Sequence, residues 1–171
     1  WDQKANYIQP FKAADKKSES VYLQKFNDPE AFYFTPENYN IKADGKADVS
    51  NALQTAINQV KTERNFGILF IPEGKYKISK TLYIPPAVRL IGYGQNRPEI
   101  ILGKNSPGFS AKEMTENNSE KYIFWFTGNM VTAENKPQDA NPGTFYSAIS
   151  NIDFRIEDGN QIAVVLRTHY A

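Results

Sequence analysis

From residue 67 onward the sequence is a succession of short apolar segments separated by proline, glycine or polar turns. Each segment is long enough for one β-strand, and several alternate apolar and polar residues, as a strand with one buried face does. The pattern predicts a mainly β protein, and it fits a β-sandwich, a barrel or a β-solenoid. The expected strands cover residues 68–71, 75–78, 82–84, 88–91, 99–102, 122–126, 148–156 and 162–166.

One amphipathic helix is expected before these strands. Its apolar stripe recurs at helical spacing and consists of Leu53, Ala56, Ile57 and Val60. Asp44-Gly45 is a turn dipeptide, and Asp48 is predicted to be the helix N-cap, because its carboxylate can accept from the first free N–H groups. Asp44 and Asp48 could also suggest paired catalytic carboxylates or a calcium site, but a turn and a cap explain them more simply.

The domain organisation expected from this pattern has two parts. Residues 1–34 are predicted to be an N-terminal arm, in which residues 31–35 form a first strand that stops at Pro36. Residues 35–171 are predicted to be the β-rich domain. Within it, two long stretches rich in Asn, Pro, Gly, Ser and Thr, residues 103–121 and 128–146, are expected to be functional or mobile loops.

Composition excludes several classes of function. The 171 residues carry 20 basic and 19 acidic side chains, a net charge of +1, which gives no argument for nucleic acid as a partner. The chain has no cysteine, so disulfides and thiolate zinc sites are excluded, and we expect no metal and no cofactor. No apolar run approaches the ~20 residues of a membrane span. The first residue, Trp1, suggests a processed N-terminus and an exported protein, secreted or periplasmic.

The order of motifs between residues 39 and 94 is specific. An aromatic residue and a short strand lead to Asp44-Gly45 and the Ala/Leu/Ile helix; Pro72-x-Gly74-x-Tyr76 follows an apolar run, and then comes Gly92-x-Gly94. This series resembles the opening of the pectate-lyase superfamily, in its rhamnogalacturonase/epimerase-like group. The resemblance implies a right-handed single-stranded parallel β-helix, of which this chain supplies the N-terminal coils, with one N-terminal capping α-helix. The sequence departs at residues 47–49, where many members carry Thr-Asp-Asp.

Two later segments, residues 97–101 and 150–154, look most like the branch that contains glycoside hydrolase family fifty-five. Members of that branch are exo-acting β-1,3-glucanases with two β-helices in one chain. The resemblance implies that the catalytic acid comes from the second β-helix, outside this segment, so the catalytic residues stay unknown. The residues present here would then form scaffold and cleft wall.

The best candidates for substrate contact directly follow a strand that is expected to be buried, where solenoid loops build binding surfaces: Arg167, Thr168, His169 and Tyr170. His169 is the only histidine, and a neutral imidazole can bind a sugar hydroxyl. Asp153 and Arg155 alternate with apolar residues and face outward, either along a groove or simply into solvent. Aromatic residues make up 13% of the chain; most are expected in the core, and some could stack on sugar rings.

The function that this resemblance implies is a polysaccharide-degrading enzyme, with a glycoside hydrolase acting on a β-glucan or related glycan favoured. A polysaccharide lyase of the same fold is an alternative, although no carboxylate-rich calcium cluster is visible. A non-catalytic glycan-binding or tailspike-like module is another. The expected partners are a polysaccharide or oligosaccharide and, since solenoid coils are stable only when stacked, the rest of the β-helix or a partner chain over the open C-terminal end.

Overall fold

The computed structural model describes residues 19–116 and 119–169 and contains three parallel sheets. The first sheet is formed by β1 (Phe32–Tyr33), β3 (Gly67–Pro72), β6 (Val88–Tyr93) and β9 (Ala148–Ser150). The second is formed by β2 (Asp44–Asp48), β4 (Lys75–Ile78), β7 (Glu99–Leu102) and β10 (Asp153–Ile156). The third is formed by β5 (Leu82–Ile84), β8 (Lys121–Phe126) and β11 (Ala163–Arg167).

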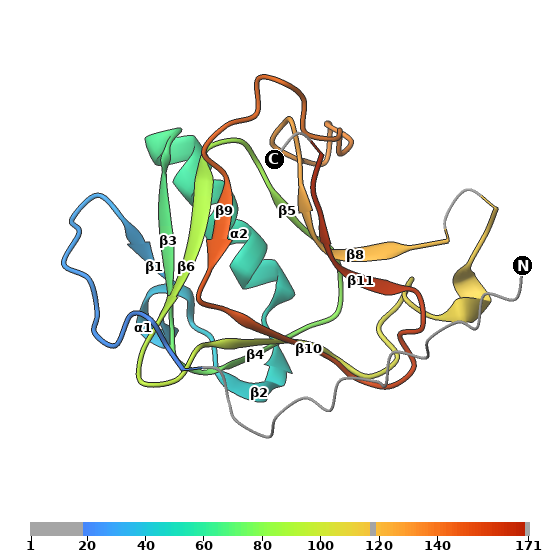
Figure 1. Ribbon diagram of the computed structural model, residues 1–171, viewed down its shortest axis with the longest axis horizontal. Coiled ribbons are helices and arrows are strands. Elements are labelled where there is room, and N and C mark those ends of the chain that lie inside the picture. The colour runs from blue at the N-terminus through green and yellow to red at the C-terminus, as the bar shows by residue number, and fades with distance from the viewer. Residues whose placement is uncertain (1–18, 117–118, 170–171) are drawn as a thin grey trace, which may run out of the picture.

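The chain visits the three sheets in rotation. β3, β4 and β5 belong to the first, second and third sheet, and β6 to β8 and then β9 to β11 repeat that order. In Figure 1 the sheets form three sides around a common interior. Every pairing between the strands is parallel. An antiparallel sandwich is therefore ruled out, and the arrangement is consistent with a parallel β-helix.

The core lies inside the three sheets, where inward side chains of successive coils stack in register. Leu69 pairs with Leu90, and Leu82 pairs with Phe124, and all four side chains are fully buried. Burial of each such side chain contributes about 1.5–3 kcal/mol. The alternation that predicted these strands therefore identifies their inward faces, and it leaves the intervening residues on the outside.

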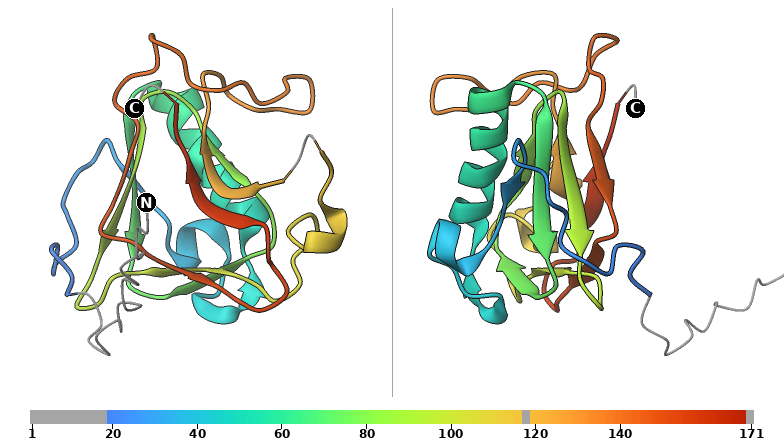
Figure 2. Two further views of the ribbon diagram at one scale, coloured as in Figure 1. Left: turned by 45° about the vertical axis from the view of Figure 1, so that its right-hand side comes forward. Right: turned by 90° about the vertical axis from the view of Figure 1, so that its left-hand side faces the viewer.

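Helix α2 (Ser50–Arg64) lies at one end of the stack, while β9, β10 and β11 lie at the other (Figure 2). Its predicted apolar stripe is confirmed as its buried face: Leu53, Ala56, Ile57 and Val60. Gln54 adds a specific contact, because its side-chain Nε2 donates to the Tyr83 carbonyl at 3.0 Å and its Oε1 accepts from the Tyr83 N–H at 2.8 Å. The Gln54 amide thus substitutes for a neighbouring strand along the edge of β5.

The predicted cap at Asp48 is wrong in detail. Val49 occupies the N-cap position of α2 and Asp48 precedes it, still within β2. The Asp48 carboxylate nevertheless accepts from the Ser50 N–H at 2.8 Å and from the Ser79 hydroxyl. Asp44, predicted in a turn, starts β2 and accepts from the Lys46 N–H at 2.8 Å, where the strand register shifts.

The prediction of a single helix is also wrong. The sequence predicts that a strand ends at Pro36, but Pro36 is the first residue of a second, four-residue helix, α1 (Pro36–Tyr39). Proline suits this first helical position, since its missing N–H would have no partner there, and the Thr35 hydroxyl caps the helix. A short 3₁₀ helix spans Ala111–Glu113. None of the helices in the described part of the chain is long and apolar enough to cross a membrane. Residues 1–18 of the predicted arm lie outside the described residues, and its boundary at residue 34 stays a prediction.

Candidate functional site

Three consecutive coils place one large outward side chain each at the same level of the third sheet. Tyr83 on β5 pairs with Trp125 on β8, and Trp125 pairs with Arg167 on β11. The Tyr83 and Trp125 ring centroids are 5.9 Å apart, and the Arg167 guanidinium lies 4.8 Å from the centre of the Trp125 ring. The parallel register thus builds a continuous strip across three strands, which we call the aromatic ladder: Tyr83, Trp125 and Arg167.

Tyr122 extends the ladder along β8. The Arg167 guanidinium also lies 4.9 Å from the Tyr122 ring centre, and its Nη1 donates to the Tyr122 hydroxyl at 2.9 Å. That hydroxyl in turn donates to Glu120 at 2.8 Å. Arg167 is therefore in contact with two aromatic rings, and its positive charge is attracted to the faces of both. The result is a partly exposed aromatic surface whose side chains have fixed positions.

Asp139, from the long loop after β8, holds this arrangement together. One carboxylate oxygen accepts from the Trp125 indole N–H at 2.9 Å and from Arg167 Nε at 2.6 Å, and the other accepts from Arg167 Nη2 at 2.5 Å. The hydrogen bonds from Arg167 hold the pKa of the Asp139 carboxyl below its usual range, although partial burial acts in the opposite direction. The loop folds back on itself just after β8, because the Gly128 N–H donates to the Gln138 carbonyl, next to Asp139, at 3.0 Å.

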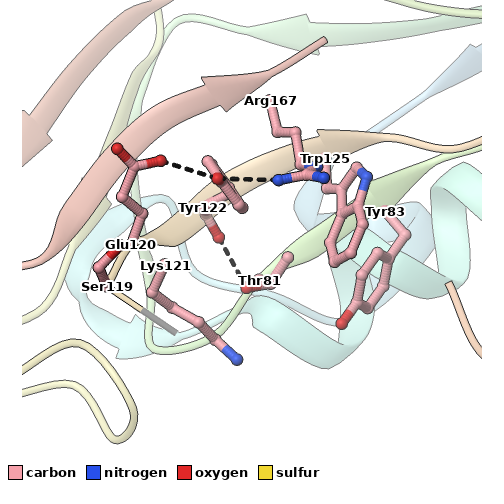
Figure 3. Close-up of a pocket in the computed structure, with 8 residues that line it drawn as sticks. All are labelled: Thr81, Tyr83, Ser119, Glu120, Lys121, Tyr122, Trp125 and Arg167. Atoms are coloured by element: carbon pink, nitrogen blue, oxygen red, sulfur yellow. Dashed lines mark hydrogen bonds between the residues drawn. The ribbon is translucent and has the colours of Figure 1, made fainter. Parts of the chain in front are cut away.

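The ladder borders a shallow depression of about 300 Å³ on the outer face of the third sheet (Figure 3). Its walls combine aromatic faces with hydroxyl, carboxylate and ammonium groups: Thr81, Tyr83, Ser119, Glu120, Lys121, Tyr122, Trp125 and Arg167. Aromatic rings pack against the C–H faces of sugar rings, while the polar groups around them can hydrogen-bond sugar hydroxyls. Chemically, this surface is suited to binding one or a few sugar residues.

Comparison of the sequence with known protein families identifies the family of this chain. Residues 36–170 match the family described as rhamnogalacturonase A/epimerase, pectate lyase-like. The chain belongs to this family. The match covers every strand from β2 to β11, and it confirms the resemblance inferred from the order of motifs between residues 39 and 94.

Two individual proteins are similar over parts of their length. A glucan 1,3-beta-glucosidase of Cochliobolus carbonum is 37% identical over 49 residues, which make up 29% of this chain and 6% of that enzyme. The chain therefore spans a small part of this relative. The crystal structure of PfbA, a surface adhesin of Streptococcus pneumoniae, superimposes with a TM-score of 0.39 at 17% identity, over 75% of this chain and 32% of the adhesin.

A second depression of this pectate lyase-like chain, about 340 Å³, lies on the outer face of the second sheet and includes the predicted groove residues Asp153 and Arg155. Four of its charged side chains form ion pairs with one another: Arg97, Glu99, Asp153 and Arg155. Asp153 lies 3.6 Å from Arg97, and Arg155 contacts Glu99 at 3.0 Å and Glu157 at 3.3 Å.

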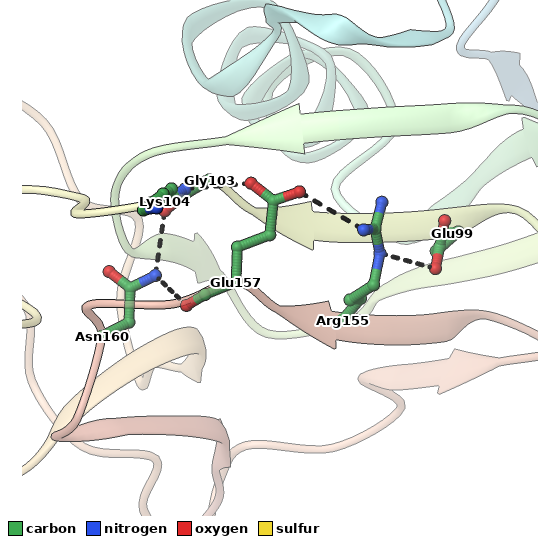
Figure 4. Close-up of polar contacts among 6 residues, drawn as sticks. All are labelled: Glu99, Gly103, Lys104, Arg155, Glu157 and Asn160. Atoms are coloured by element: carbon green, nitrogen blue, oxygen red, sulfur yellow. Dashed lines mark hydrogen bonds and ion pairs between the residues drawn. The ribbon is translucent and has the colours of Figure 1, made fainter.

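Figure 4 shows this network continuing to the buried Asn160, whose side-chain amide donates to the Gly103 and Glu157 carbonyls at 2.9 and 2.8 Å. The network joins the turn after β10 to the turn after β7. Surface ion pairs contribute little to stability, typically ~0–1 kcal/mol, and those of the second sheet offer no aromatic face to a sugar. We therefore favour the third sheet as the functional surface.

Of the four predicted contact residues, Arg167 lies in the aromatic ladder. It is the last residue of β11 and does not follow the strand as predicted, and β11 is only partly buried where a buried strand was expected. Thr168 and His169 follow it and are exposed. Tyr170 lies outside the described residues. Substrate contact by these four residues stays a prediction.

Four residues of the site are not among the contact residues predicted from the sequence: Tyr83, Tyr122, Trp125 and Asp139. A signal existed for Tyr83, the outward residue of an alternating strand. The strand of Trp125 breaks this alternation, because Ile123 and Phe124 are adjacent and both buried. Asp139 lies in an irregular loop, where periodicity carries no information. Alternation alone could therefore have identified only part of the ladder.

Proposed function

We propose that the aromatic ladder binds a polysaccharide and that the chain is part of a glycoside hydrolase acting on a β-glucan or related glycan. The observation that carries the proposal is the register match of Tyr83, Trp125 and Arg167 on three adjacent strands. Neighbouring strands are ~4.8 Å apart, so the ladder extends across the strands for about the length of two sugar units. A glycan chain lying across the coils would contact one rung after another.

The charge of the site supports a neutral glycan. Asp139 pairs with Arg167 through both carboxylate oxygens, so the only guanidinium beside the depression is already neutralised. Glu120 and Lys121 add one charge of each sign at its other end. An acidic glycan such as polygalacturonate would gain little from such a balanced surface, because electrostatic attraction requires uncompensated charge. The partial similarity to a glucan 1,3-beta-glucosidase supports the same substrate class, and the family membership supports a polysaccharide as the substrate.

In this proposal the described residues position substrate, and the catalytic acid lies outside the segment. The chain supplies the N-terminal coils of a right-handed parallel β-helix, with α2 as the cap of its first coil. The enzyme acts outside the cytoplasm, secreted or periplasmic, where polysaccharides are found. A further part of the β-helix, or a partner chain, covers the strands of the last coil.

Isothermal titration calorimetry with β-1,3-gluco-oligosaccharides tests the ladder. Trp125→Ala is expected to weaken binding about 10-fold, a loss of ~1.4 kcal/mol, because the central ring of the strip is removed. Trp125→Phe retains an aromatic face and should lose much less. Equal affinity of wild-type and Trp125→Ala protein, with both folded, would contradict the proposal.

A second assay separates enzyme from binding module. The longer protein that contains this chain should release reducing sugar from β-1,3-glucan. Binding without any release from a panel of β-glucans and polygalacturonate would instead favour a non-catalytic glycan-binding module.

A further inference from the structure

A second group of aromatic side chains lies exposed at the start of the first sheet. Phe66 precedes β3, and Phe145 and Tyr146 precede β9. Their exposed fractions are 48%, 62% and 71%, among the highest of the large apolar side chains in the described residues. The Phe66 and Tyr146 ring centroids are 5.4 Å apart, and those of Phe145 and Tyr146 are 6.2 Å apart. We call these three residues the Tyr146 surface.

The backbone holds the Tyr146 surface in place from the preceding coil. The Ala87 N–H donates to the Phe145 carbonyl at 3.0 Å and to the Ser147 hydroxyl at 3.1 Å, on either side of Tyr146. The Gly67 N–H, next to Phe66, donates to the Ala87 carbonyl at 3.0 Å. The small Ala87 side chain thus lies between the two coils that carry Phe66 and Tyr146, and their rings can meet across it.

The conformation of Tyr146 is unfavourable for a residue of its size. Its φ of +65° lies in the left-handed region, as does that of Ala87 at +68°. A non-glycine residue held there costs on the order of 1–3 kcal/mol. The conformation that places this largely exposed aromatic ring is therefore unfavourable in free energy for the backbone. Such an arrangement suggests that the ring has a ligand.

The size of the surface indicates which kind of ligand. Aromatic side chains bury roughly 150–250 Å² each when fully covered, so three rings with these exposed fractions present on the order of 400 Å². A stable protein interface needs ~800 Å² on each partner. Among residues 19–116 and 119–169, the cation in contact with these rings is Arg89, whose guanidinium lies 4.7 Å from the centre of the Phe66 ring. A small, mainly apolar and aromatic surface of this kind suits the C–H faces of two or three sugar residues.

We propose that the Tyr146 surface is a second glycan-binding site, which holds the same polysaccharide at a distance from the aromatic ladder. This inference rests on the proposed function, since it assumes that the protein binds glycans. Two sites on one polymer raise the apparent affinity because the second contact becomes intramolecular. A short oligosaccharide, which occupies one site at a time, gains nothing from the second.

Tyr146→Gly is the decisive substitution. Glycine adopts a φ of +65° without strain, so the variant loses the ring without losing stability, and its thermal midpoint should equal or exceed that of the wild type. Its binding to insoluble β-1,3-glucan particles, measured by depletion from solution, should be about 3- to 10-fold weaker. Tyr146→Phe keeps the ring and should bind as the wild type does. Met114→Ala, at another exposed apolar residue, serves as the matched control and should also leave binding unchanged.

Ligand binding at the aromatic ladder is measured separately with the same variants. In a Trp1→Phe background Trp125 is the sole tryptophan, and its fluorescence response to a short β-1,3-gluco-oligosaccharide should be the same with and without Tyr146→Gly. Wild-type affinity of Tyr146→Gly for the particles, alongside weakened binding by Trp125→Ala, would overturn the second site alone. The reverse pattern would overturn the ladder and retain the second site. Conversion of a dimer to a monomer by Tyr146→Gly, with glucan binding unchanged, would identify the surface as a self-association interface and overturn the inference.

Discussion

Asp139 connects the long loop after β8 to two members of the aromatic ladder. Its carboxylate accepts from the side chains of both Trp125 and Arg167. Trp125 can use its full ring face for a ligand only if its indole N–H is satisfied from the side, as Asp139 does here. Because the pair with Arg167 is bidentate, it fixes orientation as well as charge.

Asp139→Asn should therefore destabilise the protein in a pH-dependent way. The pKa of Asp139 is lowered in the folded state, chiefly by Arg167. Its stabilising contribution is thus complete above the unfolded-state value, about 3.9, and is lost as the pH falls through the lower folded-state value. Urea midpoints should differ between wild type and variant from pH 7 to about pH 5 and converge in more acidic solution.

The exposed Asp158 provides the control for this experiment, since Asp158→Asn should leave the urea midpoint close to that of the wild type throughout. A wild-type advantage over Asp139→Asn that persists undiminished at pH 2 would show that the charge of Asp139 is not what stabilises the site.

At the scale of elements, α2 does more than cover the core with an apolar stripe. Gln54 pairs with both backbone groups of Tyr83, and the Ser50 hydroxyl accepts from the Ser79 N–H at 2.9 Å. β5 has a strand partner on one side only, β8. The side chains of α2 therefore satisfy part of the edge that a previous coil would otherwise cover, and they set the position of Tyr83 in the ladder.

Gln54→Ala should expose this role. The substitution removes two hydrogen bonds to half-buried backbone groups of Tyr83, and two such bonds together contribute about 1–3 kcal/mol. Thermal or urea unfolding should show a loss within this range. Thr62→Ala, on the exposed side of the same helix, should change stability by no more than ~0.5 kcal/mol. Equal stability of the two variants would show that Gln54 does not support the edge.

The parts of the fold that the sequence predicts and the parts that it does not predict have different physical causes. Alternation and helical spacing predicted most strands from residue 68 onward and the buried face of α2, because burial selects apolar side chains at fixed intervals. Residues 148–156, expected as one segment, instead form β9 and β10 in two different sheets. Pro36 shows where this fails, since a strand end and a first helical residue both suit proline. The start of α2 was misplaced because Asp48 can accept from the Ser50 N–H without being the cap residue.

The candidate site was less predictable than the fold. Arg167 was identified from its place after a strand, but its partners are brought to it by strand register and by a loop contact, neither of which is local in sequence. Trp125 lies 42 residues before Arg167, and Asp139 lies 28 residues before it. Alternation along the sequence indicates which residues of each strand point outward. Which outward residues of neighbouring strands lie side by side depends on the number of residues in each coil.

At the scale of the whole molecule, the two ends of the stack differ. Inward side chains of the middle coil are fully buried, as Leu102 and Phe124 are. Their register partners in the last coil, Ile156 and Leu166, are each 40% exposed. Among the described residues, β9, β10 and β11 also have a strand neighbour on one side only. Unpaired strand edges beside apolar side chains favour association.

We therefore predict that the 171-residue chain self-associates through this end. Sedimentation velocity at increasing concentration should show species larger than the monomer. Ile156→Lys combined with Leu166→Lys should shift the distribution toward monomer, because charged side chains oppose edge-to-edge pairing. Leu23→Lys, at an exposed apolar residue of the segment before β1, is the control and should have no such effect. A wild-type chain that stays monomeric at every concentration would contradict the proposed covering of the last coil.

The proposed function requires that a glycan binds at the aromatic ladder, and the fluorescence of Trp125 reports such binding directly. In the Trp1→Phe variant, Trp125 is the sole tryptophan. Titration with a β-1,3-gluco-oligosaccharide is predicted to change its fluorescence in a saturable manner, and Asp139→Asn should weaken that response. Fluorescence that stays constant up to millimolar concentrations of β-1,3-gluco-oligosaccharides, with the protein folded, would contradict the central claim.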